Sequence, residues 1–106
     1  MNTGLFLVTR SRGPQWDDAR KMEEQDQWHA HAQFMNALAS DGFVVLGGPV
    51  VETPDTLLVI RATDETEIER RLAEDPWAQN DLLRTTKVLA WWLRLGSLPG
   101  PGEKTR

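Results

Sequence analysis

Hydrophobic residues in this chain gather in four short runs, separated by two longer stretches with helical spacing. The runs cover residues 5–10, 43–46, 57–60 and 86–95, the last centred on 88–93. Each run has the length of a β-strand and is bounded by polar, glycine or proline residues. The pattern therefore predicts four strands.

The first long stretch lies between the first two runs and is rich in helix-forming residues. Apolar side chains recur at helical spacing over residues 26–41, which predicts a helix. Gly42 follows it directly and fits the C′ position, where positive φ ends a helix. Residues 15–25 are less regular, and both a separate short helix and a mobile flap are compatible with them.

The second long stretch predicts a helix over residues 64–74. Asp64 and Glu67 have the spacing of a capping pair at its start. The pair Asp75-Pro76 then interrupts the helix, and residues 77–83 predict one or two further helical turns. Asp before Pro is a common start for a short helix, since Asp caps and Pro fits the first position.

The predicted elements follow one another as βαββαβ, the order of ferredoxin-like domains. The segment between the second and third strands is too short for a crossover helix, so these strands form an antiparallel hairpin. We therefore predict an α+β fold with a four-stranded antiparallel sheet in one domain, residues 1–96. Residues 97–106 hold glycine, proline and polar residues and predict a flexible C-terminal tail.

The strands are apolar on both sides, which is unusual for a sheet with one wet face. In the second strand, for example, Phe43 and Val45 point one way while Val44 and Leu46 point the other. Two helices can cover only one face of the sheet. The open sheet face therefore predicts a homodimer, with the sheets of two copies packed face to face.

The chain has two histidines, and helical geometry separates them. His31 falls on the apolar side of the predicted helix with Trp28 and Met35, whereas His29 points toward solvent. A metal site is not expected, because side chains two apart on a helix diverge and the chain has no cysteine. For His31, both a core histidine satisfied by a neighbour and a site histidine stay open.

Composition narrows the classes of function. A net charge of −4 argues against a nucleic-acid surface, which needs clustered positive charge. The apolar runs are too short for a membrane span, and the first residues do not have the pattern of a signal peptide. The absence of cysteine excludes disulfides and thiol catalysis, and is compatible with a cytoplasmic protein.

Several segments together resemble the YciI-like (YCII-related) proteins. They are HAQFM at 31–35, DGFVVLGGP at 41–49, LLVIRA at 57–62, LAEDPW at 72–77, the Leu82-Leu83 pair and Trp91. The resemblance implies a dimeric α+β barrel and a site formed by a helix histidine and the aspartate of an Asp-Pro pair, here His31 and Asp75. Relatives are linked to dehydrochlorination of a chlorinated hydroxyquinol, and the wider superfamily includes isomerases, monooxygenases and small-ligand binders. Asp81 and Ala90 depart from the glycine and proline that many relatives carry.

A carboxylate that accepts the Nδ1 proton of an imidazole fixes its tautomer and frees the other nitrogen for proton transfer. The resemblance gives these roles to Asp75 and His31. The expected apolar lining, suited to a flat ligand, consists of Trp28, Phe34, Trp77 and Trp91. Among Arg10, Arg61 and Arg84, we expect Arg84 to hold an anionic group, because it follows the Asp-Pro helix.

Three hypotheses follow. The first is a cofactor-free enzyme that uses His31 and Asp75 for elimination or isomerisation of a small aromatic or cyclic substrate. The second is a non-catalytic homodimer that binds a small ligand or a partner domain. The third is a haem or oxygen-handling barrel protein with His31 as the axial ligand, which has the least support.

Overall fold

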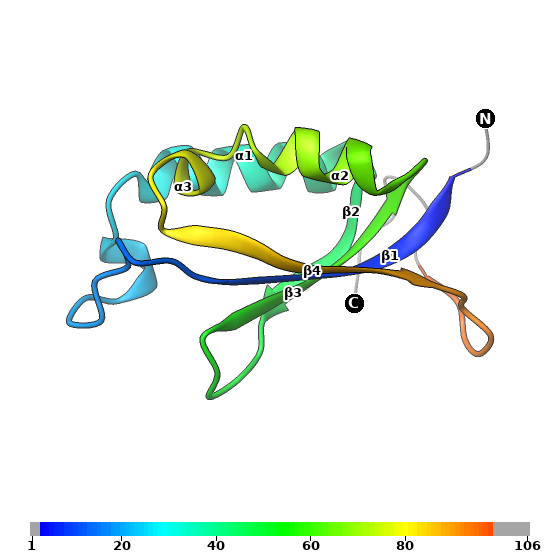
Figure 1. Cartoon of the computed structure of the whole chain (residues 1–106), viewed down its shortest axis with the longest axis horizontal. Helices are drawn as coiled ribbons and strands as arrows, with labels where there is room; N and C mark the ends of the chain where they lie inside the picture. Colours follow the sequence, from blue (N-terminus) through cyan, green and yellow to red (C-terminus); the bar gives the residue numbers. More distant parts are fainter. Residues whose placement is uncertain (1–2, 99–106) are drawn as a thin grey trace.

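The computed structural model describes residues 3–98 and has the predicted ferredoxin-like α+β fold (Figure 1). Its elements are β1 (Gly4–Arg12), the 3₁₀ helix η1 (Met22–Glu24), α1 (Trp28–Ser40), β2 (Val44–Pro49), β3 (Asp55–Ala62), α2 (Glu65–Leu72), α3 (Pro76–Gln79) and β4 (Leu83–Trp91). The strands form one antiparallel sheet in the order β2-β3-β1-β4. Most of the predicted tail, from residue 99 onward, lies outside the described residues.

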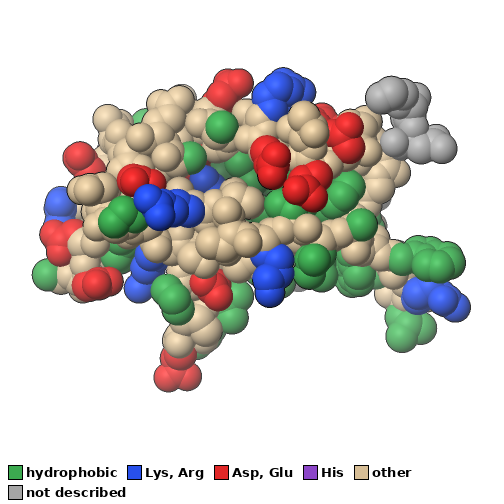
Figure 2. All heavy atoms as spheres, viewed as in Figure 1, with side chains coloured by type: hydrophobic (Ala, Val, Ile, Leu, Met, Phe, Trp, Pro, Cys, Tyr) green, Lys and Arg blue, Asp and Glu red, His purple; other side chains and the backbone are tan. Residues whose placement is uncertain are grey.

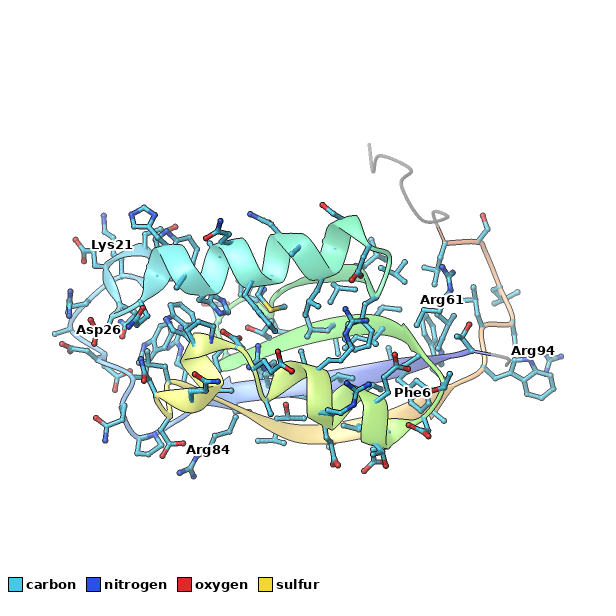
Figure 3. All side chains as sticks on the ribbon, turned by 90° about the horizontal axis from the view of Figure 1, so that it is seen from above. Phe6, Lys21, Asp26, Arg61, Arg84 and Arg94 are labelled. Carbon is cyan, nitrogen blue, oxygen red and sulfur yellow. The ribbon has the colours of Figure 1, made fainter. Side chains whose placement is uncertain are left out.

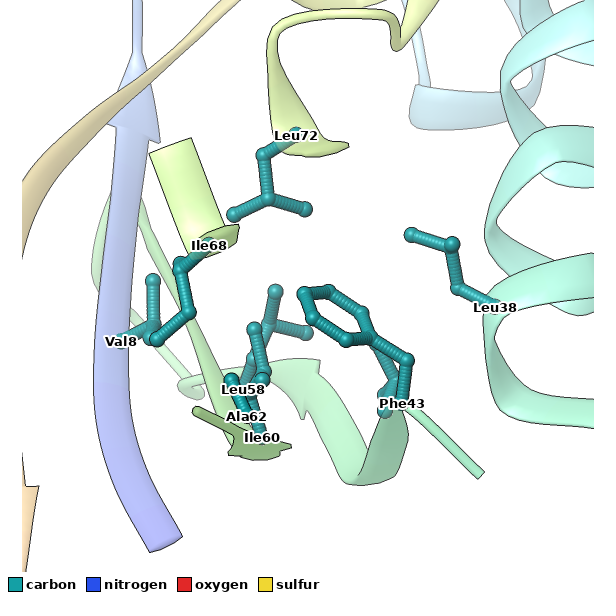
Figure 4. Packing of buried hydrophobic residues seen from close by; sticks show 9 residues of the cluster. Val8, Leu38, Phe43, Leu58, Ile60, Ala62, Ile68 and Leu72 are labelled. Atoms are coloured by element: carbon teal, nitrogen blue, oxygen red, sulfur yellow. The ribbon is translucent and has the colours of Figure 1, made fainter. Parts of the chain in front are cut away.

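The helices α1, α2 and α3 all lie on one face of the sheet (Figure 1). Alternate strand residues point toward them and form the core with side chains of α1, α2 and the start of β2 (Figure 4). Its buried members are Val8, Leu38, Phe43, Val44, Leu58, Ile60, Ala62, Ile68 and Leu72. Burying each large side chain of this kind stabilises the fold by about 1.5–3 kcal/mol.

The ends of the helices follow from local capping. Gly42 has φ of 87°, which confirms it as the C′ glycine after α1. Asp64 caps α2, since its Oδ1 accepts a hydrogen bond from the Glu67 N–H at 2.8 Å. The Glu67 carboxylate reaches back to the N–H of Thr63 at 2.8 Å, so the reciprocal bond falls one residue before the cap. The predicted capping pair is thus present in a shifted form.

Strand β4 corrects the predicted boundaries of 86–95. It begins at Leu83, because its pairing with β1 continues to Arg12 through a register shift between Thr9 and Arg10. Polar residues 84–87 are exposed, which an edge strand tolerates. The strand ends at Trp91, so the apolar residues that follow lie beyond the sheet.

Residues 13–27 form turns and the helix η1, rather than an α-helix. The buried side chain of Gln25 holds this segment together. Its Nε2 donates to the carbonyls of Asp17 at 2.7 Å and Arg20 at 3.0 Å, and its Oε1 accepts from the Asp17 N–H at 3.0 Å. These bonds satisfy backbone groups that a regular helix would pair by backbone hydrogen bonds. They also hold the segment so that Trp16 and Met22 lie beside α1 and α3.

Gly13 lies against the backbone of the loop before β4. A Cβ added there would overlap the carbonyl of Asp81, while the Gly13 N–H donates to the Leu82 carbonyl at 2.8 Å. We expect Gly13→Ala to lower the free energy of unfolding by about 1–3 kcal/mol, as overpacking commonly does. Gly48→Ala is the matched control, because a Cβ added at Gly48 would meet nothing within 4 Å. Urea denaturation measures the free energy of unfolding of both variants. An equal decrease in Gly13→Ala and Gly48→Ala would contradict the prediction.

The opposite face of the sheet has no helix over it within residues 3–98 (Figure 1). Apolar residues form a row across all four strands there: Leu46 pairs with Val59, Val59 with Leu7, and Leu7 with Leu89. Leu89 is 51% exposed, and hydrophobic side chains line the lower edge of the molecule in Figure 2. The strands are thus apolar on both sides. In the described part of the chain, no helix is long and apolar enough to cross a membrane.

Candidate functional site

A cavity of about 420 Å³ lies between α1, the strands β1, β2 and β3, and the segment 13–27. Its lining includes Arg10, Met22, Trp28, His31, Met35 and Trp77. The volume is within the range of small-molecule sites in proteins, and most of the lining is apolar. The cavity therefore suits a small, largely apolar ligand.

His31 and Asp75 meet beside this cavity, although 44 residues separate them in the chain. The His31 Nδ1 lies 2.9 Å from Asp75 Oδ1 and 3.0 Å from Oδ2. Asp75 is fully buried and His31 is 9% exposed, whereas His29 on the outer side of α1 is exposed. An ionised carboxylate only accepts hydrogen bonds, so this contact assigns the proton of the neutral ring to Nδ1.

Asp75 owes its position to the start of α3. Its Oδ1 also accepts from the Trp77 N–H at 2.9 Å, and Pro76 occupies the first helical position. The predicted N-cap role is confirmed. The same carboxylate thus caps α3 and contacts the imidazole, because α1 and α3 pack against each other.

Arg10 is a third member of the cluster. Its Nη1 donates to Asp75 Oδ2 at 2.7 Å, and the residue is only 1% exposed. On β1, Arg10 follows the core-facing residues Phe6 and Val8 at a spacing of two, which points its side chain toward the helices. That alternation is the signal by which the sequence could have favoured Arg10 over Arg84.

Arg84 does not line the cavity, contrary to the expectation from sequence. Its side chain points outward from the sheet edge (Figure 3). Its Nε and Nη2 pair with the exposed carboxylate of Asp81 at 2.9 and 3.0 Å. The loop before β4 turns this side chain toward solvent rather than toward α1.

The aromatic residues of the predicted lining divide into two groups. Trp28 and Trp77 line the cavity, as expected. Phe34 packs instead against the main core, and Trp91 pairs with Leu5 on the side of the sheet that faces away from the helices. Helical spacing places Phe34 at the margin of the apolar side, and strand alternation places Trp91 on the open face.

Trp77 fixes the plane of the histidine ring. The two rings stack with centroids 3.8 Å apart and an angle of 6° between their planes. Trp77 is itself held by its Nε1–H, which donates to the Asp26 carbonyl at 2.6 Å, and by edge contact with Trp16 at 5.4 Å. His31 is therefore oriented by a carboxylate at one nitrogen and by an aromatic face.

Burial alone would raise the pKa of Asp75, because it disfavours a charge. The hydrogen bond from His31 and the positive charge of Arg10 outweigh burial, and they hold the pKa below its ordinary value of 3.8. Asp75 is thus a carboxylate at neutral pH. It can accept the Nδ1 proton and would stabilise an imidazolium.

Comparison with protein families finds a match to the YCII-related domain over residues 5–92. Comparison with curated proteins and with solved structures finds no match. The matched residues include the whole of the His31–Asp75–Arg10 cluster and nearly all of the sheet.

Proposed function

This chain belongs to the YCII-related domain family, and from that premise we propose that it is an enzyme of small-molecule acid–base chemistry. His31 transfers the proton, and Asp75 holds the ring in the tautomer that leaves Nε2 unprotonated. The observation that supports this proposal is the contact of His31 Nδ1 with both oxygens of a buried carboxylate beside a cavity.

The arrangement suits removal of a proton from carbon. Within residues 3–98, the hydrogen bonds of the His31 ring run through Nδ1, and Nε2 remains available to a ligand. In an elimination, a C–H proton passes to Nε2, its electron pair forms the new C=C bond, and a halide leaves with the electrons of its bond. In an isomerisation, the imidazolium returns the proton to a different carbon of the same ligand.

The test is hydrogen–deuterium exchange at carbon, followed by NMR in D₂O. The wild-type protein is incubated with a panel of cyclic enols, enol lactones and chlorinated hydroxyquinols. We expect enzyme-dependent exchange or chloride release for at least one class, and its loss in His31→Asn. Binding of panel compounds without any exchange or release would favour the alternative of a non-catalytic ligand-binding domain.

We also propose that two copies of the chain associate through the open sheet face. The two ends of the apolar row support this, because Leu46 is 37% and Leu89 is 51% exposed, whereas Val59 within the row is already buried. Exposed apolar patches on soluble proteins commonly mark interfaces. A second copy of the same sheet would bury the row against an identical surface.

Analytical ultracentrifugation at micromolar concentration tests the association. We expect the wild-type protein to sediment as a dimer and Leu89→Arg to sediment as a monomer, because a charge on this face would lose its solvation in the interface. Gln33→Arg is the control, since Gln33 is exposed on α1, on the helical side. A monomeric wild-type protein, or a dimeric Leu89→Arg variant, would exclude this interface.

A further inference from the structure

Two arginines, Arg10 and Arg12, line the cavity, although the chain as a whole is acidic, with a net charge of −4. Asp55 is the one carboxylate among the described lining residues, and Arg10 is paired with the buried carboxylate of Asp75 beside the cavity. Asp55 Oδ1 accepts a hydrogen bond from Ser11 Oγ at 2.6 Å, and the carboxylate keeps its negative charge. The formal charges around the cavity therefore nearly balance, so an anionic ligand would be held by local donors rather than by the overall charge of the cavity.

Arg10 has donors that the protein does not use. Its Nη1 is paired with Asp75, but its Nε and Nη2 are buried and have no hydrogen-bond partner in residues 3–98. Buried polar groups in native proteins are satisfied in nearly all cases. A buried guanidinium with two unpaired nitrogens beside a cavity is therefore suited to receive an acceptor from a ligand.

Met35 lies beside the Arg10 guanidinium in the lining of the cavity. Its Sδ lies 3.8 Å from Arg10 Nη1, and Met35 also lines the cavity. A methionine side chain is unbranched and changes rotamer easily, so it can move aside when a ligand enters. The structure thus places a flexible side chain against the Arg10 guanidinium.

We propose that the ligand is an oxyanion on a flat apolar body, with its carboxylate or phenolate oxygens bound by Arg10. The planar guanidinium matches such groups, and the charge assists the hydrogen bonds. The apolar body lies against Trp28 and Trp77, near His31. As a substrate class, this ligand rests on the function proposed above, but the binding of the oxyanion requires no proton transfer.

The test compares two probes of the same shape, 2-naphthoate and its neutral analogue 2-naphthamide, by isothermal titration calorimetry. We expect wild-type protein to bind the anion at least about tenfold more tightly, as a charge-assisted hydrogen bond allows. Arg84→Gln is the matched control and keeps the preference, because Arg84 lies outside the cavity. In Arg10→Gln, the preference should fall to about twofold or less.

His31→Asn separates this inference from the proposed chemistry, because it should retain the preference for the anion while losing proton transfer. Equal affinities for the two probes in the wild-type protein would overturn the inference, as would a full preference in Arg10→Gln. If Arg10→Gln does not fold, the inference is tested instead by following the Arg10 Nε–H signal of the wild-type protein in ¹H–¹⁵N NMR. A shift with 2-naphthoate supports the inference, and an unchanged signal overturns it.

Discussion

Replacing Asp75 with Asn is expected to lower the free energy of unfolding by about 3–5 kcal/mol, the usual loss when one partner of a buried ion pair is removed. Asp75 is fully buried and accepts from Arg10, His31 and the Trp77 N–H. Asparagine can still cap α3, but it leaves the buried charge of Arg10 uncompensated. Chemical denaturation of both proteins measures the loss.

Asp81→Asn is the matched control. It makes the same chemical change in an exposed pair, because Asp81 binds Arg84 at the protein surface. Such pairs contribute little to stability, and asparagine tolerates the positive φ of 63° found at this position. If Asp75→Asn were no more harmful than Asp81→Asn, Asp75 would not be the centre of the cluster.

The free energy of unfolding at acidic pH gives a second measure of the contribution of Asp75. The pKa of Asp75 lies below 3.8 in the folded protein, so its ionisation stabilises the fold at pH values above its unfolded pKa. That contribution declines as the pH falls below about 4 and through the folded pKa. In Asp75→Asn, the free energy of unfolding should therefore decrease less as the pH falls through this range than it does in the wild-type protein.

His31→Asn is expected to reduce proton transfer by about 10²–10⁴-fold, the usual contribution of a general acid–base group. Asparagine has no ionisable nitrogen at the position of Nε2. His29→Asn is the control on the same helix, since His29 is exposed on its outer side and should leave the rate unchanged. The rate of deuterium incorporation into the reactive substrate measures both variants.

Secondary structure and sheet topology of His31→Asn should match the wild-type protein by circular dichroism and NMR, so that a lost rate reports chemistry. A rate that falls equally in His29→Asn and His31→Asn would indicate a general effect on α1. An unchanged rate in His31→Asn would remove His31 from the proton transfer.

Local patterns in the sequence are enough to predict much of the fold. The spacing of apolar residues orders the strands and helices, and directs His31 inward and His29 outward. The Asp75-Pro76 pair predicts the start of α3, because capping depends on neighbouring residues alone. Gly42 likewise ends α1 through a local requirement for positive φ.

Features that depend on pairing between distant segments are harder to predict. The start of β4 depends on a register shift opposite Thr9 and Arg10, which no pattern within residues 83–91 reveals. Proximity to α3 in the sequence favours Arg84 over Arg10, yet the turn at Asp81 directs Arg84 to solvent. The contact between His31 and Asp75 is implied only by family resemblance, since the packing of α1 on α3 brings them together.

The protonation state of the His31 ring tests the proposed chemistry most directly. Long-range ¹H–¹⁵N correlation spectra distinguish Nδ1 from Nε2, and the His29→Asn variant identifies the signals of the remaining histidine. As the pH is raised until the ring is neutral, we expect the proton on Nδ1 and a free Nε2 beside the cavity, and Asp75→Asn should disturb this preference. A neutral His31 that carries its proton on Nε2 in the wild-type protein would contradict the proposed role of both residues.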